Sequence, residues 1–244
     1  MPKRTYGQYC ALARALDVVG DRWTLLMVRE LLFGPKRYTD LLDALPGIGT
    51  SLLIERLRHL EADGLVGRRR LPPPAGSHVY ELTAVGAALG DALLPLALWG
   101  ARHLLGARRP GEDFRAEWPL LALRGMVDPA AADGINQEVE FHIEDSIAHL
   151  RIANGLVSVH PGPTLDAPEV TVTLDLETFV AVGSGRLDLA EAIATGHMTV
   201  DGAPESIDAL VTLLSTAVSM ARDRPLSPPG SSAIARESPQ TRRR

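Results

Sequence analysis

At 244 residues the chain is long enough for one large domain or two modest ones, and its 45% hydrophobic and 23% charged residues are typical of a folded globular protein. The single cysteine excludes an internal disulfide, and the first ten residues lack the apolar core of a secretory signal, so we expect a cytoplasmic protein. Residues 1–110 carry 15 Lys and Arg against 10 Asp and Glu, whereas residues 111–220 carry 4 against 18. This contrast indicates two modules, of which only the first attracts a polyanion.

The first half is predicted to begin with a series of short helices. Apolar residues recur at helical spacing over residues 12–19 and 23–31, and the second of these periods includes Glu30. Thr39 is placed to cap a third helix, which ends before the Pro-Gly pair at residues 46–47.

A fourth helix is predicted to begin near Thr50 and to end at Gly64. Its residues Leu53, Leu57 and Leu60 share one side of the helix, so this side is expected to be buried. The outward side is polar and is therefore able to reach the edges of bases.

Two extended stretches follow, over residues 65–71 and 78–83, joined by the turn-rich segment PPPAGS. Three successive arginines, Arg68, Arg69 and Arg70, lie near the end of the first stretch. Helix, turn, helix and then a basic hairpin is the order of a winged helix, whose recognition helix enters a major groove while the hairpin follows the neighbouring backbone or minor groove. Because side chains alternate along a strand, two of the three arginines are expected to meet DNA.

Residues 84–105 form the most apolar run of the chain. Asp91, Pro95 and Arg102 interrupt this run, so it makes a poor membrane span, and we expect no membrane contact. A buried or dimer-forming helix is the better interpretation.

Residues 10 to about 103 resemble the HxlR-type bacterial transcriptional regulators. The resemblance rests on CALARALDVVGDRW, on WTLLMVRELLFGPKRYTDLLDALPGIGTSLLIERLRHLEADGLVGRR and on YELTAVGAAL. It implies a homodimer that binds double-stranded DNA at a pseudo-palindromic operator. It also implies that the helices over residues 10–19 and 84–105 pack across the two-fold axis.

The residues expected to contact DNA carry positive charge or present polar groups on the fourth helix. They are Lys36, Arg37, Thr50, Ser51, Glu55, Arg56, Arg58, Arg68, Arg69, Arg70 and His78. Each phosphate neutralised releases condensed cations, so binding should weaken steeply with salt. Arg58 pairs naturally with guanine and Glu55 with cytosine, while Thr50 and Ser51 are further base-reading candidates. The alternative is that Glu55 and Arg56 only form surface ion pairs.

The second half changes to alternating patterns typical of strands. VEFHIED and VTVTLD alternate apolar with polar residues, and Asn154-Gly155 is a favoured hairpin turn between two more strands. Residues 130 to about 220 resemble the sterol carrier protein domain, through VTVTLDLETFVAVGSGRLDLAEAIATGHMTVDGAPESIDALVTLL. The resemblance implies a curved sheet covered by helices around an apolar tunnel, which binds a lipid-like or other apolar small molecule.

The fold class expected is therefore a mainly α winged helix-turn-helix domain plus a C-terminal α+β sterol carrier protein-like domain. The expected boundaries are residues 1–105, a linker over 106–129, residues 130–221 and a disordered tail over 222–244, which is rich in Pro, Ser and Arg. The tunnel lining would come from Leu150, Ile152, Phe179, Val182, Leu189, Ile193, Leu210 and Leu214. The same residues are equally what a closed core requires.

The sequence predicts no metal site, no cofactor and no catalytic constellation. The histidines are scattered, a single cysteine forms no thiolate cluster, and Gly183-Ser184-Gly185 lacks the third glycine of a dinucleotide fingerprint. Cys10 is a redox-sensing candidate, because its place matches the cysteine that some members of the HxlR family use as an oxidant sensor. The alternative for Cys10 is a buried packing residue.

Two functions from different classes follow. The first is a dimeric bacterial transcriptional regulator, not an enzyme, whose second domain binds a small apolar effector or helps to dimerise. The second is a lipid or small-molecule carrier whose winged helix serves only dimerisation or protein contacts. Salt-dependent binding to duplex DNA separates the two.

Overall fold

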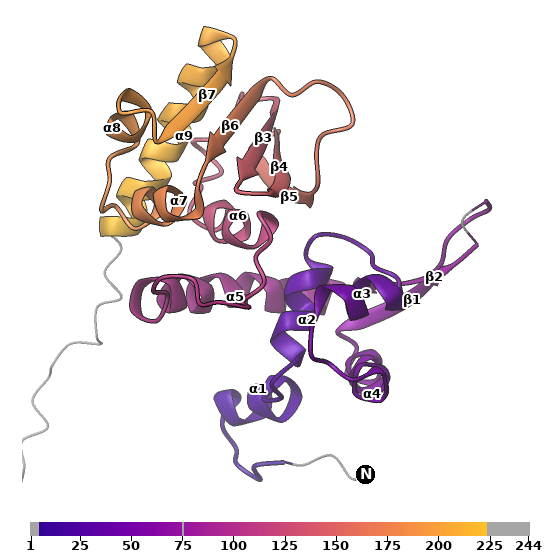
Figure 1. Cartoon of the computed structure of the whole chain (residues 1–244). Helices are drawn as coiled ribbons and strands as arrows, with labels where there is room; N and C mark the ends of the chain where they lie inside the picture. The colour runs from indigo at the N-terminus through magenta and orange to yellow at the C-terminus, as the bar shows by residue number, and fades with distance from the viewer. Residues whose placement is uncertain (1–4, 75, 224–244) are drawn as a thin grey trace, which may run out of the picture.

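The structure, a computed structural model, describes residues 5–74 and 76–223 (Figure 1). The N-terminal part contains short helices, a two-stranded hairpin and one long helix. These elements are α1 (Ala11–Val19), α2 (Thr24–Leu31), α3 (Tyr38–Ala44), α4 (Thr50–Ala62), β1 (Val66–Arg70), β2 (His78–Leu82) and α5 (Ala84–His103). This order is the predicted winged helix.

The first hydrophobic core forms where α2, α3 and α4 meet. The predicted stripe of α4 is confirmed, because Leu53, Leu57 and Leu60 are all buried. They pack in one cluster with Met27 of α2 and Leu41 of α3. Burial of these side chains is the main force that orients α4, since each contributes about 1.5–3 kcal/mol relative to an exposed position.

One detail of the first helices differs from the sequence predictions, at the start of α3. Thr39 does not cap α3, because the helix already begins at Tyr38. Instead the carboxylate of Asp40 accepts a hydrogen bond of 2.8 Å from the backbone N–H of Arg37, which serves the N-terminus of α3 equally well. Gly64, by contrast, follows α4 as predicted and has a left-handed φ of 70°.

The hairpin β1–β2 projects from the body of the protein (Figure 1). Its antiparallel register pairs Arg68 with Tyr80 and Arg70 with His78. The base of the hairpin is fixed to the segment before α3, because Lys36 and Tyr80 exchange two backbone hydrogen bonds of 2.9 and 2.8 Å. Backbone hydrogen bonds therefore join the loop between α2 and α3 to the β1–β2 hairpin, which is the wing of the winged helix.

The long helix α5 is apolar but mostly exposed within a single chain. Over Ala84–Ala101 it is long and apolar enough to cross a membrane by length and composition, a test that helices of soluble proteins also pass. Its inner side packs tightly, since Gly90 lies against Leu32 and Leu94 lies against Gly125. α5 thus connects the winged helix to the second domain.

The second domain is a five-stranded sheet with helices packed on one face. Its elements are α6 (Glu117–Arg124), β3 (Gln137–Ile143), β4 (Ser146–Ala153), β5 (Leu156–Pro161), β6 (Val170–Leu174), α7 (Leu176–Gly183), α8 (Leu189–Ala194), β7 (Met198–Gly202) and α9 (Pro204–Asp223). The strand order is β5-β4-β3-β6-β7, in which only the β3–β6 pairing is parallel. The α+β architecture and the Asn154-Gly155 hairpin turn were both predicted.

The sequence analysis missed one helix of this domain. α6 lies inside the segment 106–129, which was expected to be only a linker, and Leu120, Leu121 and Leu123 are buried in the core of the second domain. Phe33 also belongs to that core, so the two domains share packed side chains. The predicted tail falls outside the described residues, apart from its first two positions at the end of α9.

Candidate nucleic-acid interface

The outward side of α4 carries the predicted base-reading residues. Thr50, Ser51, Glu55 and Arg58 are all exposed, as the helical spacing requires. α4 is held at its first turn by α3, because the Tyr38 hydroxyl donates a hydrogen bond of 3.1 Å to the carbonyl oxygen of Thr50. The polar side of α4 therefore faces solvent, while the first turn of the helix is fixed to α3.

The same side of α4 carries one apolar residue that the sequence analysis did not single out. Ile54 is 41% exposed although it is a large aliphatic residue. It follows the buried Leu53 by one position and precedes Arg58 by four, so it shares the outward face with Arg58. An exposed aliphatic group beside polar ones suits contact with a thymine methyl group.

Glu55 and Arg56, which were each expected either to contact DNA or to form only a surface ion pair, differ in the structure. Arg56 forms an ion pair with Asp21, which supports the surface-pair reading for this arginine. Glu55 and Arg58, in contrast, are both exposed on the outward side of α4, where a ligand can reach them.

The arginine triplet of the wing divides in two. Arg69 lies on one face and makes a two-pronged pair with Glu81, at 3.0 Å from Nε and 2.9 Å from Nη2. These hydrogen bonds raise the pKa of Arg69 and lower the pKa of Glu81. Arg68 and Arg70 share the other face with Tyr80 and His78, so two arginines point one way, as strand alternation predicts.

The two remaining predicted cations lie beside the start of α3. Arg37 is exposed, whereas Lys36 points inward, with 15% of its side chain exposed and its Nζ 3.7 Å from Oε2 of Glu30. The expectation that Lys36 lies open to phosphate is not met in this arrangement, because a buried carboxylate attracts the ammonium.

Comparison with known proteins gives a match for each domain. The HxlR-like helix-turn-helix family matches residues 18–107. The HTH-type transcriptional regulator sll1512 of Synechocystis is 37% identical over 101 residues, which cover 41% of this chain and 70% of that protein. The regulator YtcD of Bacillus subtilis is 34% identical over 107 residues, which cover 43% of this chain and 81% of that protein. The chain belongs to the HxlR-like helix-turn-helix family.

Solved structures similar to this HxlR-like protein include the reduced form of the B. subtilis regulator YodB. It is 30% identical and covers 43% of this chain and all of that chain, with a TM-score of 0.36. In the second domain, residues 120–219 match the alkyl sulfatase C-terminal family. Both relatives are named HTH-type transcriptional regulators, and the stretches that match them cover 41% and 43% of this chain.

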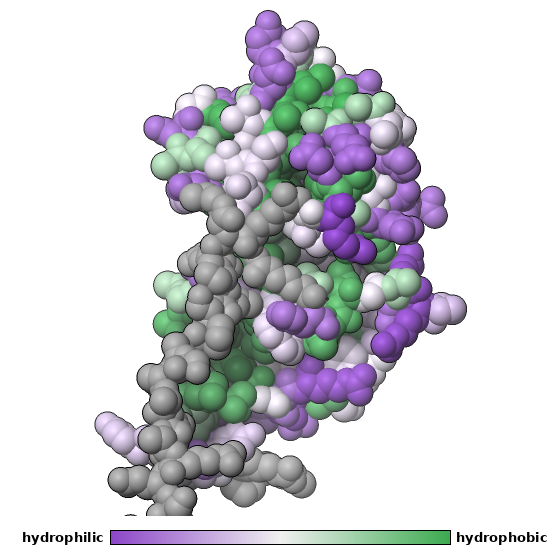
Figure 2. Space-filling view, turned by 90° about the vertical axis from the view of Figure 1, so that its left-hand side faces the viewer, coloured by the Kyte–Doolittle hydropathy of each residue, from purple (hydrophilic) through white to green (hydrophobic). Residues whose placement is uncertain are grey.

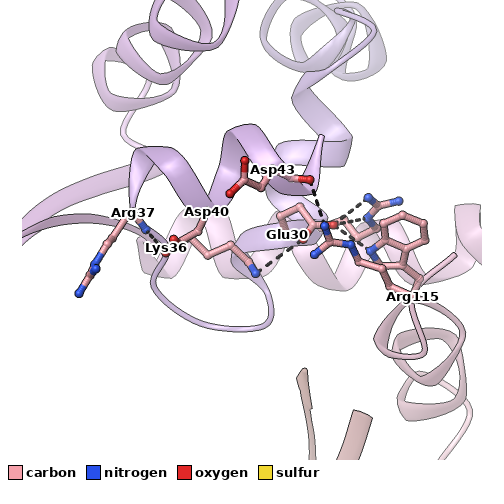
Figure 3. A network of polar contacts seen from close by, with 8 residues as sticks. Glu30, Lys36, Arg37, Asp40, Asp43 and Arg115 are labelled. Atoms are coloured by element: carbon pink, nitrogen blue, oxygen red, sulfur yellow. Dashed lines mark hydrogen bonds and ion pairs between the residues drawn. The ribbon is translucent and has the colours of Figure 1, made fainter. Parts of the chain in front are cut away.

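The HxlR-like domain also contains a buried polar network that the sequence analysis did not predict (Figure 3). Glu30 is fully buried and accepts hydrogen bonds from Arg29 at 2.7 Å and from Nε1 of Trp118 at 2.9 Å. Arg115 donates from the second domain to the carbonyl oxygen of Asp43 at 3.0 Å. The one available signal was the position of Glu30 within an apolar helical period, since a buried carboxylate needs partners.

Only some of the predicted ligand-lining residues line a common cavity. Phe179, Val182, Leu189 and Leu214 line a cavity of about 30 Å³. A cleft of about 160 Å³ adjoins it, with Asp188, Ser215 and Ser219 among its lining residues. Leu150, Ile152, Leu210 and Ile193 belong instead to the packed core or its edge. Both spaces are smaller than the roughly 300–1,000 Å³ of usual small-molecule pockets.

Cys10, the redox-sensing candidate, immediately precedes α1 and is exposed in the single chain. The alternative that Cys10 is a buried packing residue is therefore wrong for the isolated protomer. Among the described residues no group of three or more histidine, cysteine or acidic side chains is arranged to hold a metal ion.

Proposed function

We propose that the protein is a cytoplasmic, dimeric transcriptional regulator that places α4 in a major groove and the wing along the adjacent backbone. The observation that carries this proposal is the arrangement of the exposed polar side of α4 beside a hairpin whose Arg68 and Arg70 share one face. In this role Arg58 reads guanine, Glu55 reads cytosine and Ile54 contacts a thymine methyl group. Thr50 and Ser51 reach phosphates or bases at the start of α4, and Arg37 and His78 add backbone contacts.

Binding to duplex DNA tests this function. We expect the affinity of the full chain for a labelled duplex to fall by orders of magnitude between about 50 and 200 mM salt, because several phosphates are neutralised. Fluorescence anisotropy across a salt series measures this slope. A response that hardly changes with salt would favour the rival carrier function, in which the winged helix serves only protein contacts.

The dimer proposed here uses the faces of α1 and α5. Both helices expose large apolar side chains, among them Leu12, Leu16, Val85, Leu96 and Trp99. Figure 2 shows apolar residues at the level of α1 and α5 in Figure 1, as well as in the upper half of the molecule. Large exposed apolar patches mark interaction sites, and burial between two copies would remove this one from water.

We propose further that the cleft beside α9 takes a small apolar effector. The resemblance of residues 130 to about 220 to sterol carrier proteins is the argument for a binding role, while a volume of about 160 Å³ limits the ligand to roughly the size of one aromatic ring. Native mass spectrometry of the purified protein is expected to give the mass of a dimer, with or without a retained molecule. A monomer at micromolar concentration would contradict the dimer.

A thiol response is the second candidate function. YodB, a relative 34% identical over 85 residues, has been solved in diamide-treated, reduced and quinone-bound forms. The exposure of Cys10 in this chain favours a similar chemistry, in which the thiols of two protomers form an intersubunit disulfide. Diamide is expected to produce a dimer band on nonreducing gels that is absent from Cys10→Ser. An unchanged gel for the wild type would remove this candidate.

A further inference from the structure

The carboxylate of Glu30 lies between the two domains, and its two oxygens differ in the number of hydrogen bonds that they accept. Its Oε1 accepts hydrogen bonds from Nε and Nη2 of Arg29, at 3.0 and 2.7 Å, and from Nε1 of Trp118 at 2.9 Å. Its Oε2 is buried without a hydrogen-bond partner among the described residues. The ammonium of Lys36 lies 3.7 Å from Oε2. Lys36 is therefore attracted to a carboxylate whose other oxygen is already well bonded.

The second domain supplies one of these bonds. Trp118 lies on α6, and its ring is covered by the guanidinium of Arg29 at 4.0 Å from the ring centroid. The adjacent Glu117 is 3% exposed. Burial is the main cause that raises the pKa of Glu117, and the negative charge of Glu30 adds to it. Trp118 therefore links α6 of the second domain to the carboxylate that faces Lys36.

Lys36 connects this network to the DNA-binding surface. Its backbone is bonded to Tyr80 of the wing, and its neighbour Arg37 is exposed at the start of α3. A lysine at this place has a long flexible side chain whose ammonium can turn inward or outward while the backbone stays fixed. In this structure the ammonium turns inward, toward Glu30 (Figure 3).

We propose that Glu30 is a positioning residue of the DNA-binding surface, which holds the ammonium of Lys36 away from the phosphate backbone, and that Trp118 of the second domain sets the strength of this hold. The inference rests on the proposed DNA-binding function. The hydrogen bond from Trp118 partly satisfies the carboxylate and so weakens its attraction for Lys36. A movement of α6 that withdraws Trp118 strengthens that attraction and holds the ammonium of Lys36 more firmly inward, whereas loss of the charge on Glu30 releases it.

Two substitutions are expected to change the accessibility of the Lys36 ammonium in opposite directions, which a purely structural role would not produce. Glu30→Gln keeps an oxygen that accepts from Trp118 but removes the charge, so Lys36 is released and the salt slope of duplex binding steepens by about 0.9 per protomer. Between 50 and 200 mM salt this corresponds to a change of roughly threefold per protomer. Trp118→Phe keeps a ring under Arg29 but removes the N–H donor, so the ammonium of Lys36 is held more firmly inward while the affinity for the duplex stays near that of the wild type.

The test uses the full chain and a labelled 30-base-pair duplex of mixed sequence, with anisotropy read across a potassium chloride series. Lys36→Met is combined with each variant in a double-mutant cycle. We expect Lys36→Met to change little in the wild type and to abolish the gain in Glu30→Gln. An equal effect of Lys36→Met in both backgrounds, or parallel shifts in Glu30→Gln and Trp118→Phe, overturns the proposal.

A second measurement needs no DNA and so separates failure of this inference from failure of the proposed function. The chain has only two lysines, Lys3 and Lys36, so acetic anhydride labelling followed by mass spectrometry gives the ratio of Lys36 to Lys3 directly. The ratio is expected to rise in Glu30→Gln and to fall in Trp118→Phe, with thermal melting as a check on folding. An unchanged ratio in both folded variants overturns the hold on Lys36, whereas a wild type that binds no duplex overturns the regulatory function alone.

Discussion

Replacing both Arg68 and Arg70 with alanine is expected to lower the affinity for duplex DNA by about 60-fold per protomer near 0.1 M salt. The two guanidinium groups share one face of the wing, so their removal takes away two phosphate contacts in each protomer. Each lost contact makes the slope of log affinity against log salt shallower by about 0.9. Anisotropy measured at several salt concentrations gives both the affinity and the slope.

The matched control for this experiment lies on the opposite face of the same hairpin. Arg69 is already paired with Glu81, so the double substitution Arg69→Ala and Glu81→Ala leaves the net charge of the wing unchanged. We expect this control to bind DNA nearly as well as the wild type, since exposed pairs contribute little. An equally large loss of affinity in the control would show that the face bearing Arg68 and Arg70 is not the one that meets DNA.

The elements that could be predicted from the sequence are those fixed by local periodicity. The buried stripe of α4 follows from leucines three and four residues apart, and the hairpin at Asn154-Gly155 follows from two residues that tolerate positive φ. Strand alternation likewise predicted that the arginine triplet would divide. These patterns depend only on neighbours along the chain.

The inward direction of Lys36 could not be predicted in the same way. It depends on Glu30 and on Trp118, which lies 88 residues from Glu30 in the sequence. α6 escaped prediction for a related reason, since its eight residues include Pro119 and are followed by Gly125, and its leucines are explained only by the core they join. An acidic residue inside an apolar helical period was the sole local sign that two distant segments meet there.

Replacing Gly86 with alanine is expected to destabilise the winged helix by about 3 kcal/mol, which corresponds to a fall in melting temperature on the order of 10 °C. Gly86 is in the first turn of α5, where its N–H donates to the Thr83 side chain at 3.1 Å. An added Cβ would overlap the carbonyl oxygen of Leu65 and would lie 3.1 Å from the Leu82 side chain. The same oxygen accepts the backbone N–H of Thr83 at 3.0 Å, so it cannot move without loss.

Two other glycines of α5 give the matched comparison. Gly100 has nothing within 4 Å of an added Cβ, so Gly100→Ala is expected to stabilise the helix by about 0.5–1 kcal/mol through propensity alone. At Gly90 an added Cβ meets only the Leu32 side chain, which can rotate, so the cost should fall between the two. Urea unfolding of the three variants measures this order. Equal stabilities of the three variants would contradict the view that the close approach of Gly86 to the Leu65 backbone fixes the start of α5 relative to the wing. This contact also sets the angle at which α5 presents its apolar face to a second copy.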